Sequence, residues 1–87
     1  MTLSKAATLL KAMANIKRLE ILLYLSHDEL SVGDLEQKLD LTQSALSQHL
    51  AVLREAEIVQ TRRYRQQIFY RLENPLIKKI LKLLTKD

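Results

Sequence analysis

The sequence holds few side chains that could do covalent or metal chemistry. Its 87 residues include no cysteine and only two histidines, His27 and His49. A tight transition-metal site needs several nitrogen, sulfur or carboxylate ligands in one place, so we expect no metal and no cofactor. Ser47 and His49 are two positions apart, a spacing that turns them away from each other on a helix. With no glycine-rich phosphate loop either, the sequence predicts that the protein is not an enzyme.

Hydrogen-bonding chemistry is concentrated in residues 42–56, TQSALSQHLAVLREA. At about 100° per residue, a helix here has an apolar side formed by Ala45, Leu46, Leu50, Leu53 and Ala56. Its other side is small and polar and is formed by Ser44, Ser47, Gln48, Ala51 and Glu55. Glutamine can pair with both the acceptor and the donor of an adenine edge, and serine can bind a base or a phosphate. This face suits the DNA major groove, although an ordinary solvated helix has the same composition.

Basic side chains follow directly after this helix. The formal net charge is +4, but residues 58–72 contain four arginines and no acid, whereas residues 28–40 contain five acids and one lysine. Arg62, Arg63 and Arg65 lie near the middle of the basic segment, and guanidinium groups bind phosphates through charge and fork geometry. An arginine run alone is often a solvated strand edge. Together with the polar helix, it predicts double-stranded DNA as the partner.

The remaining sequence predicts the elements that position these side chains. Apolar residues at helical spacing predict a first helix over about 2–14 and a central core helix over 16–25, for which Asn15 is a good cap. Asn74 and Pro75 are a typical cap and first-turn pair for a last helix over about 75–86.

Between these helices the sequence predicts a helix-turn-helix followed by a hairpin. Ser31 and Asp34 resemble a capping box at the start of a short helix, and Thr42 caps the next one, so residues 31–56 form the helix-turn-helix unit. Branched and aromatic residues over 58–72 are typical of a tight two-stranded hairpin. The expected fold is a single domain over residues 1–87, mainly α with a small β-hairpin: a winged helix-turn-helix with five helices and a two-stranded wing.

Three motifs carry a resemblance to a known family. ANIKRLEILLYL, ELSVGDLEQKLDLTQSALSQHLAVLREAEIV and TRRYRQQIFYRL, in this order, resemble the arsenic-repressor-like (ArsR/SmtB-type) winged-helix transcription regulators from about residue 14 to residue 84. Within the family, the chain is most similar to the branch of the haemolysin activator and the biofilm-growth repressors. The resemblance implies a homodimer joined through the first and last helices, with two recognition helices in successive major grooves of an inverted repeat.

The resemblance also implies roles for individual residues. It places the DNA contacts at Gln43, Ser44, Ser47, Gln48, Arg62, Arg63 and Arg65. Arg18 matches an arginine that is typical of the family. It could contact a phosphate or pair with a carboxylate of the same chain, and we include it among the expected DNA contacts. His49 turns inward, so a structural hydrogen bond is favoured over a base contact. The expected dimer interface consists of Leu3, Leu10, Met13, Leu76, Ile80, Leu81 and Leu84.

Two departures from the family pattern matter. Arg65 stands where the wing often has glycine, so we expect a different turn and an extra phosphate contact. Metal-binding members of the family have cysteines at the positions of Ser31 and Gly33, and members that sense sulfur species have a cysteine near Leu23. A further metal site of the family lies on the last helix, where this chain offers only Asp87 as a ligand. None of these three sensing sites can therefore form here. The control signal is therefore left open between an unknown small molecule, a partner protein and the abundance of the protein itself.

The function that these features predict is sequence-specific binding to double-stranded DNA. The protein is expected to be a dimeric repressor or anti-repressor acting on an inverted-repeat operator. Charges throughout the amino-terminal 25 residues argue against a signal peptide or membrane span, and the location is expected to be cytoplasmic. The alternative is a winged helix that uses its basic wing to bind an acidic protein.

Overall fold

Each of the five helices begins at a polar side chain that caps its first turn. In the computed structural model, which describes residues 1–86, the side chains of Thr2, Asn15, Ser31, Thr42 and Asn74 each accept a hydrogen bond from a backbone N–H of the helix that follows. Ser31 and Asp34 form a complete capping box, and Pro75 occupies the first turn of the last helix. The caps predicted at Asn15, Ser31, Thr42 and Asn74 are confirmed.

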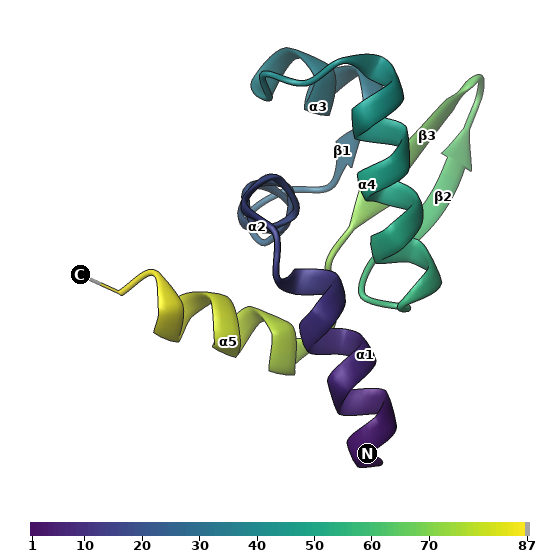
Figure 1. The fold of residues 1–87 in the computed structure, drawn as a ribbon. Coiled ribbons are helices and arrows are strands. Elements are labelled where there is room, and N and C mark those ends of the chain that lie inside the picture. Colours follow the sequence, from purple (N-terminus) through teal and green to yellow (C-terminus); the bar gives the residue numbers. More distant parts are fainter. Residues whose placement is uncertain (87) are drawn as a thin grey trace.

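The elements follow one another as Figure 1 shows. Their bounds are α1 (Leu3–Met13), α2 (Ile16–Leu25), β1 (Leu30–Ser31), α3 (Val32–Lys38), α4 (Gln43–Glu55), β2 (Gln60–Tyr64), β3 (Gln67–Arg71) and α5 (Pro75–Leu84). The predicted winged helix-turn-helix with five helices is confirmed. Asp87, the last residue of the predicted domain, lies outside the described residues.

The core is built around α2, as its nearly all-round apolar sequence predicts. Ile21 and Leu22 are completely buried. The other large side chains that are fully buried come from α3, α4, the segment after α4, and α5: Leu35, Leu46, Leu53, Ile58 and Ile77. Burial of this kind contributes about 25 cal/mol per Å² of apolar surface, and it fixes α4 and the sheet on the same core.

The sheet has one strand more than the sequence predicted. Its order is β1-β3-β2, with Leu30 opposite Tyr70 and Ser31 opposite Phe69 in an antiparallel pairing. A two-residue strand is too short to show an alternating pattern, and Ser31 also caps α3, so the sequence indicated only the cap. The additional strand, β1, ties the base of the wing to the segment that leads into the helix-turn-helix.

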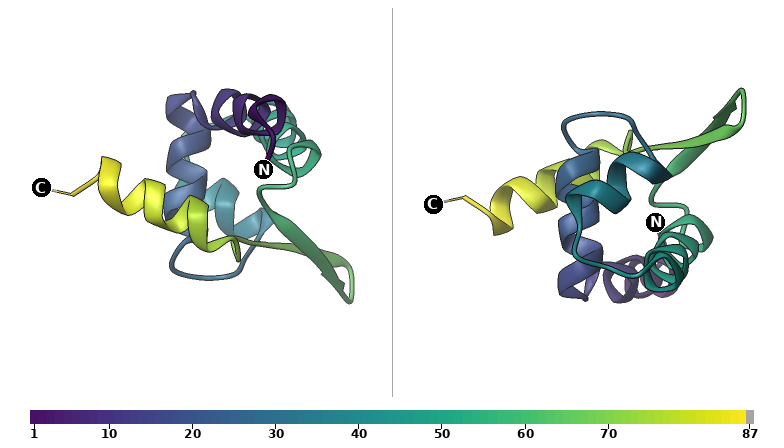
Figure 2. Two further views of the ribbon diagram at one scale, coloured as in Figure 1. Left: turned by 90° about the horizontal axis from the view of Figure 1, so that it is seen from below. Right: turned by 90° about the horizontal axis from the view of Figure 1, so that it is seen from above.

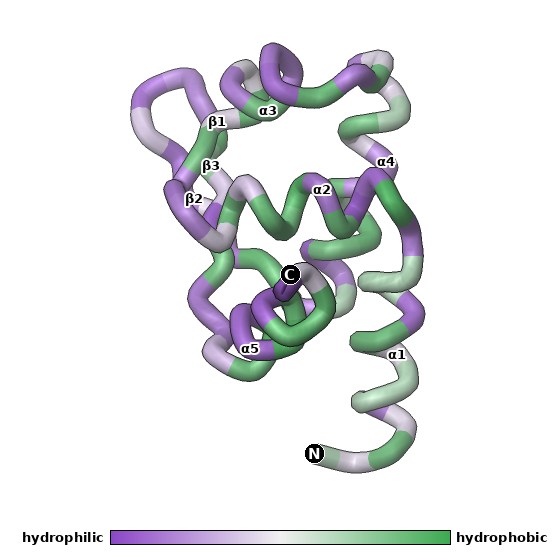
Figure 3. The backbone as a smooth tube through the Cα atoms, turned by 90° about the vertical axis from the view of Figure 1, so that its left-hand side faces the viewer, coloured by the Kyte–Doolittle hydropathy of each residue, from purple (hydrophilic) through white to green (hydrophobic). Residues whose placement is uncertain are grey.

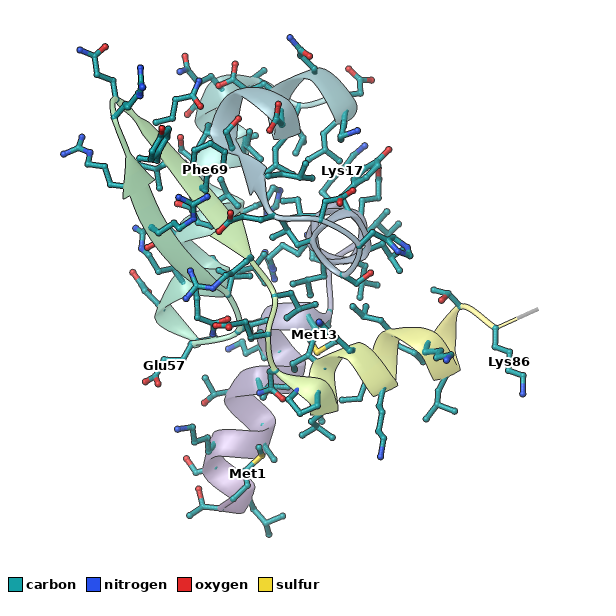
Figure 4. The ribbon with its side chains drawn as sticks, turned by 180° about the vertical axis from the view of Figure 1, so that it is seen from behind. Met1, Met13, Lys17, Glu57, Phe69 and Lys86 are labelled. Carbon is teal, nitrogen blue, oxygen red and sulfur yellow. The ribbon has the colours of Figure 1, made fainter. Side chains whose placement is uncertain are left out.

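The end of α4 contains a left-handed residue that is not glycine. Glu57 has a φ of 58°. Its N–H donates to the carbonyl of Arg54, and the N–H of Ile58 donates to the carbonyl of Leu53, both at 3.0 Å. These are the two hydrogen bonds of a Schellman motif, which usually has glycine in this position. The motif turns the chain directly from the recognition helix into the wing, and Figure 4 labels Glu57 at this corner.

We expect Glu57→Gly to stabilise the protein. A left-handed φ costs a non-glycine residue roughly 1–2 kcal/mol, part of which the extra backbone entropy of glycine offsets, so the free energy of unfolding should rise by about 0.5–1 kcal/mol. Urea unfolding followed by circular dichroism measures it. Glu55→Gly, two positions earlier at the last residue of α4, is the control; it has no positive φ to relieve and should lower stability by up to about 1 kcal/mol. A loss of stability in Glu57→Gly would contradict the strain argument.

The tip of the wing also keeps a left-handed residue. Arg65 has a φ of 59°, in the two-residue connection between Tyr64 and Gln67, which are paired across the strands. Arg65 thus adopts the positive φ that glycine reaches most readily, and the different turn and the extra phosphate contact expected from the sequence stay predictions. Figure 2 shows that the wing and α5 extend from opposite sides of the body.

Helices α1 and α5 each have one apolar side packed on the core and another that is exposed. The predicted dimer residues are distributed over both sides. Met13 and Leu81 are only 3% and 2% exposed within a single chain, so they have almost no surface to offer to a partner chain, and their assignment to the dimer interface stays a prediction. Figure 4 shows Met13 at the junction of α1 with the body. They lie on the sides of α1 and α5 that pack on the core. Ile80 is half-buried against the same core.

The other predicted interface residues are exposed. Leu3 and Leu10 are 89% and 55% exposed, and Leu76 and Leu84 are exposed too, as is Leu83, which the prediction left out. The amino-terminal part of α1 projects from the body (Figure 1), and Figure 3 shows apolar segments along α1 as far as this projecting end. Within residues 1–86, no helix combines the length and the apolar character that crossing a membrane requires.

Candidate nucleic-acid interface

The exposed side of α4 is the side that the sequence predicted. Gln43, Ser44, Ser47 and Gln48 are all exposed, while the buried residues of the helix are Leu46, Leu50 and Leu53. The leucines fix the rotation of the helix about its axis, because turning it would expose them to water. The polar face is therefore presented outward by the packing of the core and not by contacts of its own.

A hydrogen bond ties α4 to the sheet. Nη1 of Arg54 donates to the hydroxyl oxygen of Tyr70 on β3 at 2.9 Å. Tyr70 is otherwise buried in the core. The recognition helix and the wing are thus held together at two points, by this bond and by the short segment that follows Glu57. The sequence analysis missed this pair, since nothing in the local pattern relates residue 54 to residue 70.

The wing arginines lie on two different faces of the sheet. Arg63 is opposite Ile68, and Arg62 is opposite Phe69. Successive residues of a strand point to opposite faces, so Arg63 shares a face with Ile68 and with Tyr70, whose hydroxyl meets α4, whereas Arg62 shares the other face with Phe69. The prediction treated the arginines as one cluster beside α4, and the alternation already present in the sequence could have separated them.

Arg63 and Arg65 are the available cations of the wing. Both are exposed, and neither forms a salt bridge within the part of the chain that the structure describes. The guanidinium of Arg65 lies 5.4 Å from the ring centroid of Tyr64, a cation–π distance that limits the side chain to fewer conformations. A positive charge is therefore held at the tip of the wing.

Arg62 already has a partner. Its Nε and Nη2 donate to the two carboxylate oxygens of Glu29, at 2.8 and 2.7 Å. The hydrogen bond from Arg62 is the main reason why the pKa of Glu29 is lowered, and the bond to Glu29 in turn raises the pKa of Arg62. The sequence analysis missed the role of Glu29, although an acid-rich segment before α3 and an acid-free wing are a charge pattern that favours such a pair.

Arg18 forms no carboxylate pair among residues 1–86, and its phosphate contact stays a prediction. Its Nε donates to the carbonyl of Ala12, and its Nη2 lies 3.5 Å from the carbonyl of Lys11. These are carbonyls in the last turn of α1, where a positive charge is also favourable for the helix dipole. The partners of Arg18 are therefore backbone groups and not a carboxylate, and the side chain joins α2 to the end of α1.

His49 faces inward from α4, as its helical position predicts. Its Nδ1 lies 3.4 Å from Nη1 of Arg18. Because a guanidinium can only donate, Nδ1 accepts in this contact when it carries no proton. Burial is the main cause that lowers the pKa of His49 below its ordinary value of 6.5, and the charge of Arg18 is the second. The contact links α4 to α1 through Arg18.

The shifted pKa of His49 predicts a stability that depends on pH. Because the unfolded chain takes up the proton more readily than the folded one, the contribution of His49 is complete above the ordinary value of 6.5 and is lost as the pH falls below it. Urea unfolding at pH 7.5 and at pH about 5.5 measures the difference. His49→Gln should reduce this difference; the same difference in His49→Gln as in the wild type would contradict the assignment.

Among residues 1–86, the histidines, aspartates and glutamates form no cluster of three or more that could hold a metal ion. The site thus consists of an exposed hydrogen-bonding helix face and two available guanidinium groups. It can bind a polyanion and discriminate among hydrogen-bonding patterns at its surface.

This combination of fold and site defines a winged helix-turn-helix protein. A family model described as "Bacterial regulatory protein, arsR family" matches residues 15–61, more than half of the chain. The chain therefore belongs to the arsR family of bacterial regulatory proteins. The family consists of transcription regulators and not of enzymes. The predicted family and the prediction that the protein is not an enzyme are therefore confirmed.

Similar proteins lie in the branch that the resemblance indicated. The transcriptional activator HlyU of Vibrio cholerae is 53% identical over 81 residues, covering 93% of this chain and 75% of that protein. The biofilm growth-associated repressor of Agrobacterium fabrum is 55% identical over 69 residues, covering 79% of this chain and 59% of the repressor. This chain thus spans less than two thirds of some curated relatives.

Solved structures agree with the fold. HlyU from Vibrio cholerae matches with a TM-score of 0.87 at 53% identity, covering 93% of this chain and 88% of that chain. NolR from Sinorhizobium fredii matches with a TM-score of 0.88 at 48% identity, covering 95% of this chain and 83% of that chain.

Proposed function

We propose that this chain acts as a homodimer that binds double-stranded DNA at an inverted-repeat operator and thereby regulates transcription, as a repressor or anti-repressor in the cytoplasm. In this proposal α3 and α4 form the reading unit, β2 and β3 form the wing, and α1 and α5 hold the dimer together. The observation that carries it is the exposed Gln/Ser face of α4 beside the available guanidinium groups of Arg63 and Arg65.

The roles of the contacts follow from their chemistry. Gln43, Ser44, Ser47 and Gln48 are the candidate base readers, because amides and hydroxyls match the donors and acceptors of base edges in the major groove. Arg63 and Arg65 are the candidate phosphate contacts, which hold the protein in register without reading the sequence. Arg18 supports DNA binding indirectly, as a positioning residue on α2 that contacts the end of α1 and the recognition helix α4.

The exposed leucines support the dimer. A lone chain would leave Leu3, Leu10, Leu76, Leu83 and Leu84 in water, and a large exposed apolar surface is typical of an interface. A relative from Mycobacterium bovis, 27% identical with a TM-score of 0.85, is described as a homodimeric winged helix-turn-helix DNA-binding domain. Two recognition helices related by a two-fold axis bind half-sites about one helical turn apart. Occupancy of such a site would block or displace other proteins on the promoter.

The test is selection of bound fragments from a random duplex DNA pool at near-physiological salt, followed by sequencing. Enrichment of an inverted repeat with half-sites about 10 base pairs apart is the expected result. A folded, dimeric protein that enriches no sequence would overturn the proposal. It would move the assignment to the alternative, in which the basic wing binds an acidic protein.

A further inference from the structure

The face of the sheet turned away from α4 carries a row of three side chains that crosses all three strands. Glu29 precedes β1 by one residue, Phe69 lies on the central strand β3, and Arg62 lies on the edge strand β2. Ser31, Phe69 and Arg62 are successive partners across the strands, and Glu29 shares the face of Ser31 because the two are two positions apart in an extended segment. Figure 4 labels Phe69 on the sheet.

The guanidinium group of Arg62 has several partners in this row. Two parallel hydrogen bonds of 2.8 and 2.7 Å join its guanidinium to Glu29. The same guanidinium lies 4.9 Å from the ring centroid of Phe69 and 5.9 Å from that of Tyr64. A bidentate charge-assisted pair is stronger and more directional than a single hydrogen bond, and the rings limit the side chain further. The side chain is nevertheless 48% exposed, so it remains within reach of a large anion.

A DNA phosphate would have to compete for this arginine. To donate to a phosphate through the same two nitrogens, Arg62 must leave the Glu29 carboxylate, and that carboxylate would then lie unpaired near the DNA backbone. Arg63 and Arg65 have no such carboxylate partner within residues 1–86. Of the four arginines of the wing, Arg62 and Arg71 form salt bridges with Glu29 and Glu73. The wing therefore offers the free charge of only two.

We propose that Glu29 sets the DNA affinity of the protein by withholding Arg62 from the phosphate backbone. The inference rests on the proposed function and deepens it. Glu29 is an intramolecular competitor for a phosphate, and it acts on all DNA sequences alike because a phosphate contact carries no base information. Its effect is to raise the protein concentration at which an operator becomes occupied, without changing which operator is chosen.

The experiment compares Glu29→Gln with Asp28→Asn. Both substitutions remove one negative charge from the same loop, but Asp28 forms no salt bridge among the described residues. Binding to the selected operator and to a random duplex is measured by fluorescence anisotropy between about 50 and 200 mM salt. For Glu29→Gln we expect tighter binding to both duplexes and a salt dependence steeper by about 0.9 in the log–log slope. Between about 50 and 200 mM salt, Glu29→Gln should therefore lose roughly 3.5-fold more affinity than the wild type loses.

A second pair of variants identifies the arginine responsible. Arg62→Gln alone should leave the salt slope of the wild type unchanged. In the Glu29→Gln background, the same substitution should cancel the gain. Circular dichroism checks that each variant is folded.

Three results would overturn the inference. The salt slope of Glu29→Gln could equal that of Asp28→Asn, Glu29→Gln could bind more weakly than the wild type, or Arg62→Gln alone could lower the slope by about 0.9. In each case the wild type still binds DNA, so the proposed function stands and only the role of Glu29 is wrong. If the wild type binds no duplex at all, the proposed function fails and the inference fails with it.

Discussion

Replacing Leu10 by glutamate should split the dimer and abolish tight binding to a full operator at the same time. Leu10 is 55% exposed on α1, seven residues or about two helical turns after Leu3, and this spacing places the two on the same side of the helix. A charge there would be buried without a partner in the dimer, at a cost far larger than the loss of one apolar contact. In the separate chain, the same glutamate would remain in water, so the protomer should stay folded.

The loss on DNA is expected to be large because the two half-sites are bound together. When one recognition helix is bound, the second is held close to its own half-site, and such linkage contributes a factor of about 100 or more to affinity. Sedimentation velocity measures the oligomeric state of Leu10→Glu, and anisotropy measures its affinity for the full operator. A variant that is monomeric but still binds the full operator tightly would contradict the role proposed for this face.

Two further substitutions separate assembly from folding. Thr8→Glu places the same charge on the same helix, outside the face that Leu3 and Leu10 share, and it should remain dimeric. Leu81→Glu places the charge at a residue that is only 2% exposed in the protomer, so it should unfold the chain and not merely separate the subunits. The loss of the circular dichroism signal in Leu81→Glu, but not in Leu10→Glu, would distinguish the two apolar faces.

The sequence predicted best what depends on neighbours along the chain. The caps at Asn15, Ser31, Thr42 and Asn74 depend on a side chain two or three residues before its partner, and the exposed face of α4 depends on helical periodicity alone. The motifs of the helix-turn-helix and the wing also sufficed to identify the family.

Features that depend on distant residues escaped the prediction. The apolar residues of α1 look alike in sequence, yet Met13 packs on the core and Leu3 points away from it. The difference depends on where α2 and α4 pack against α1. The same holds for Arg18, whose partners at the end of α1 lie six and seven residues away, and for Glu29 and Arg62, which are 33 residues apart. An ion pair between distant residues can be identified only when the arrangement of the strands is known.

Gln48 should contribute to the choice of operator more than any arginine does. It is exposed on α4, and its amide can donate to and accept from one adenine edge at the same time. Loss of such a bidentate contact costs on the order of 1–3 kcal/mol, which corresponds to about 5-fold to 150-fold in affinity. We therefore expect Gln48→Ala to weaken binding to the selected operator by this factor and to leave binding to random duplexes nearly unchanged.

Arg63→Ala supplies the contrasting result, because a phosphate contact is present on every sequence. Its affinity should fall for operator and random duplex alike, with a salt slope lower by up to about 0.9. Gln37→Ala, an equivalent truncation at an exposed position of α3, controls for the loss of a surface amide. Equal losses on operator and random DNA for Gln48→Ala would show that α4 binds the backbone there. The specificity would then have to come from Gln43, Ser44 or Ser47, or from the sequence-dependent shape of the DNA.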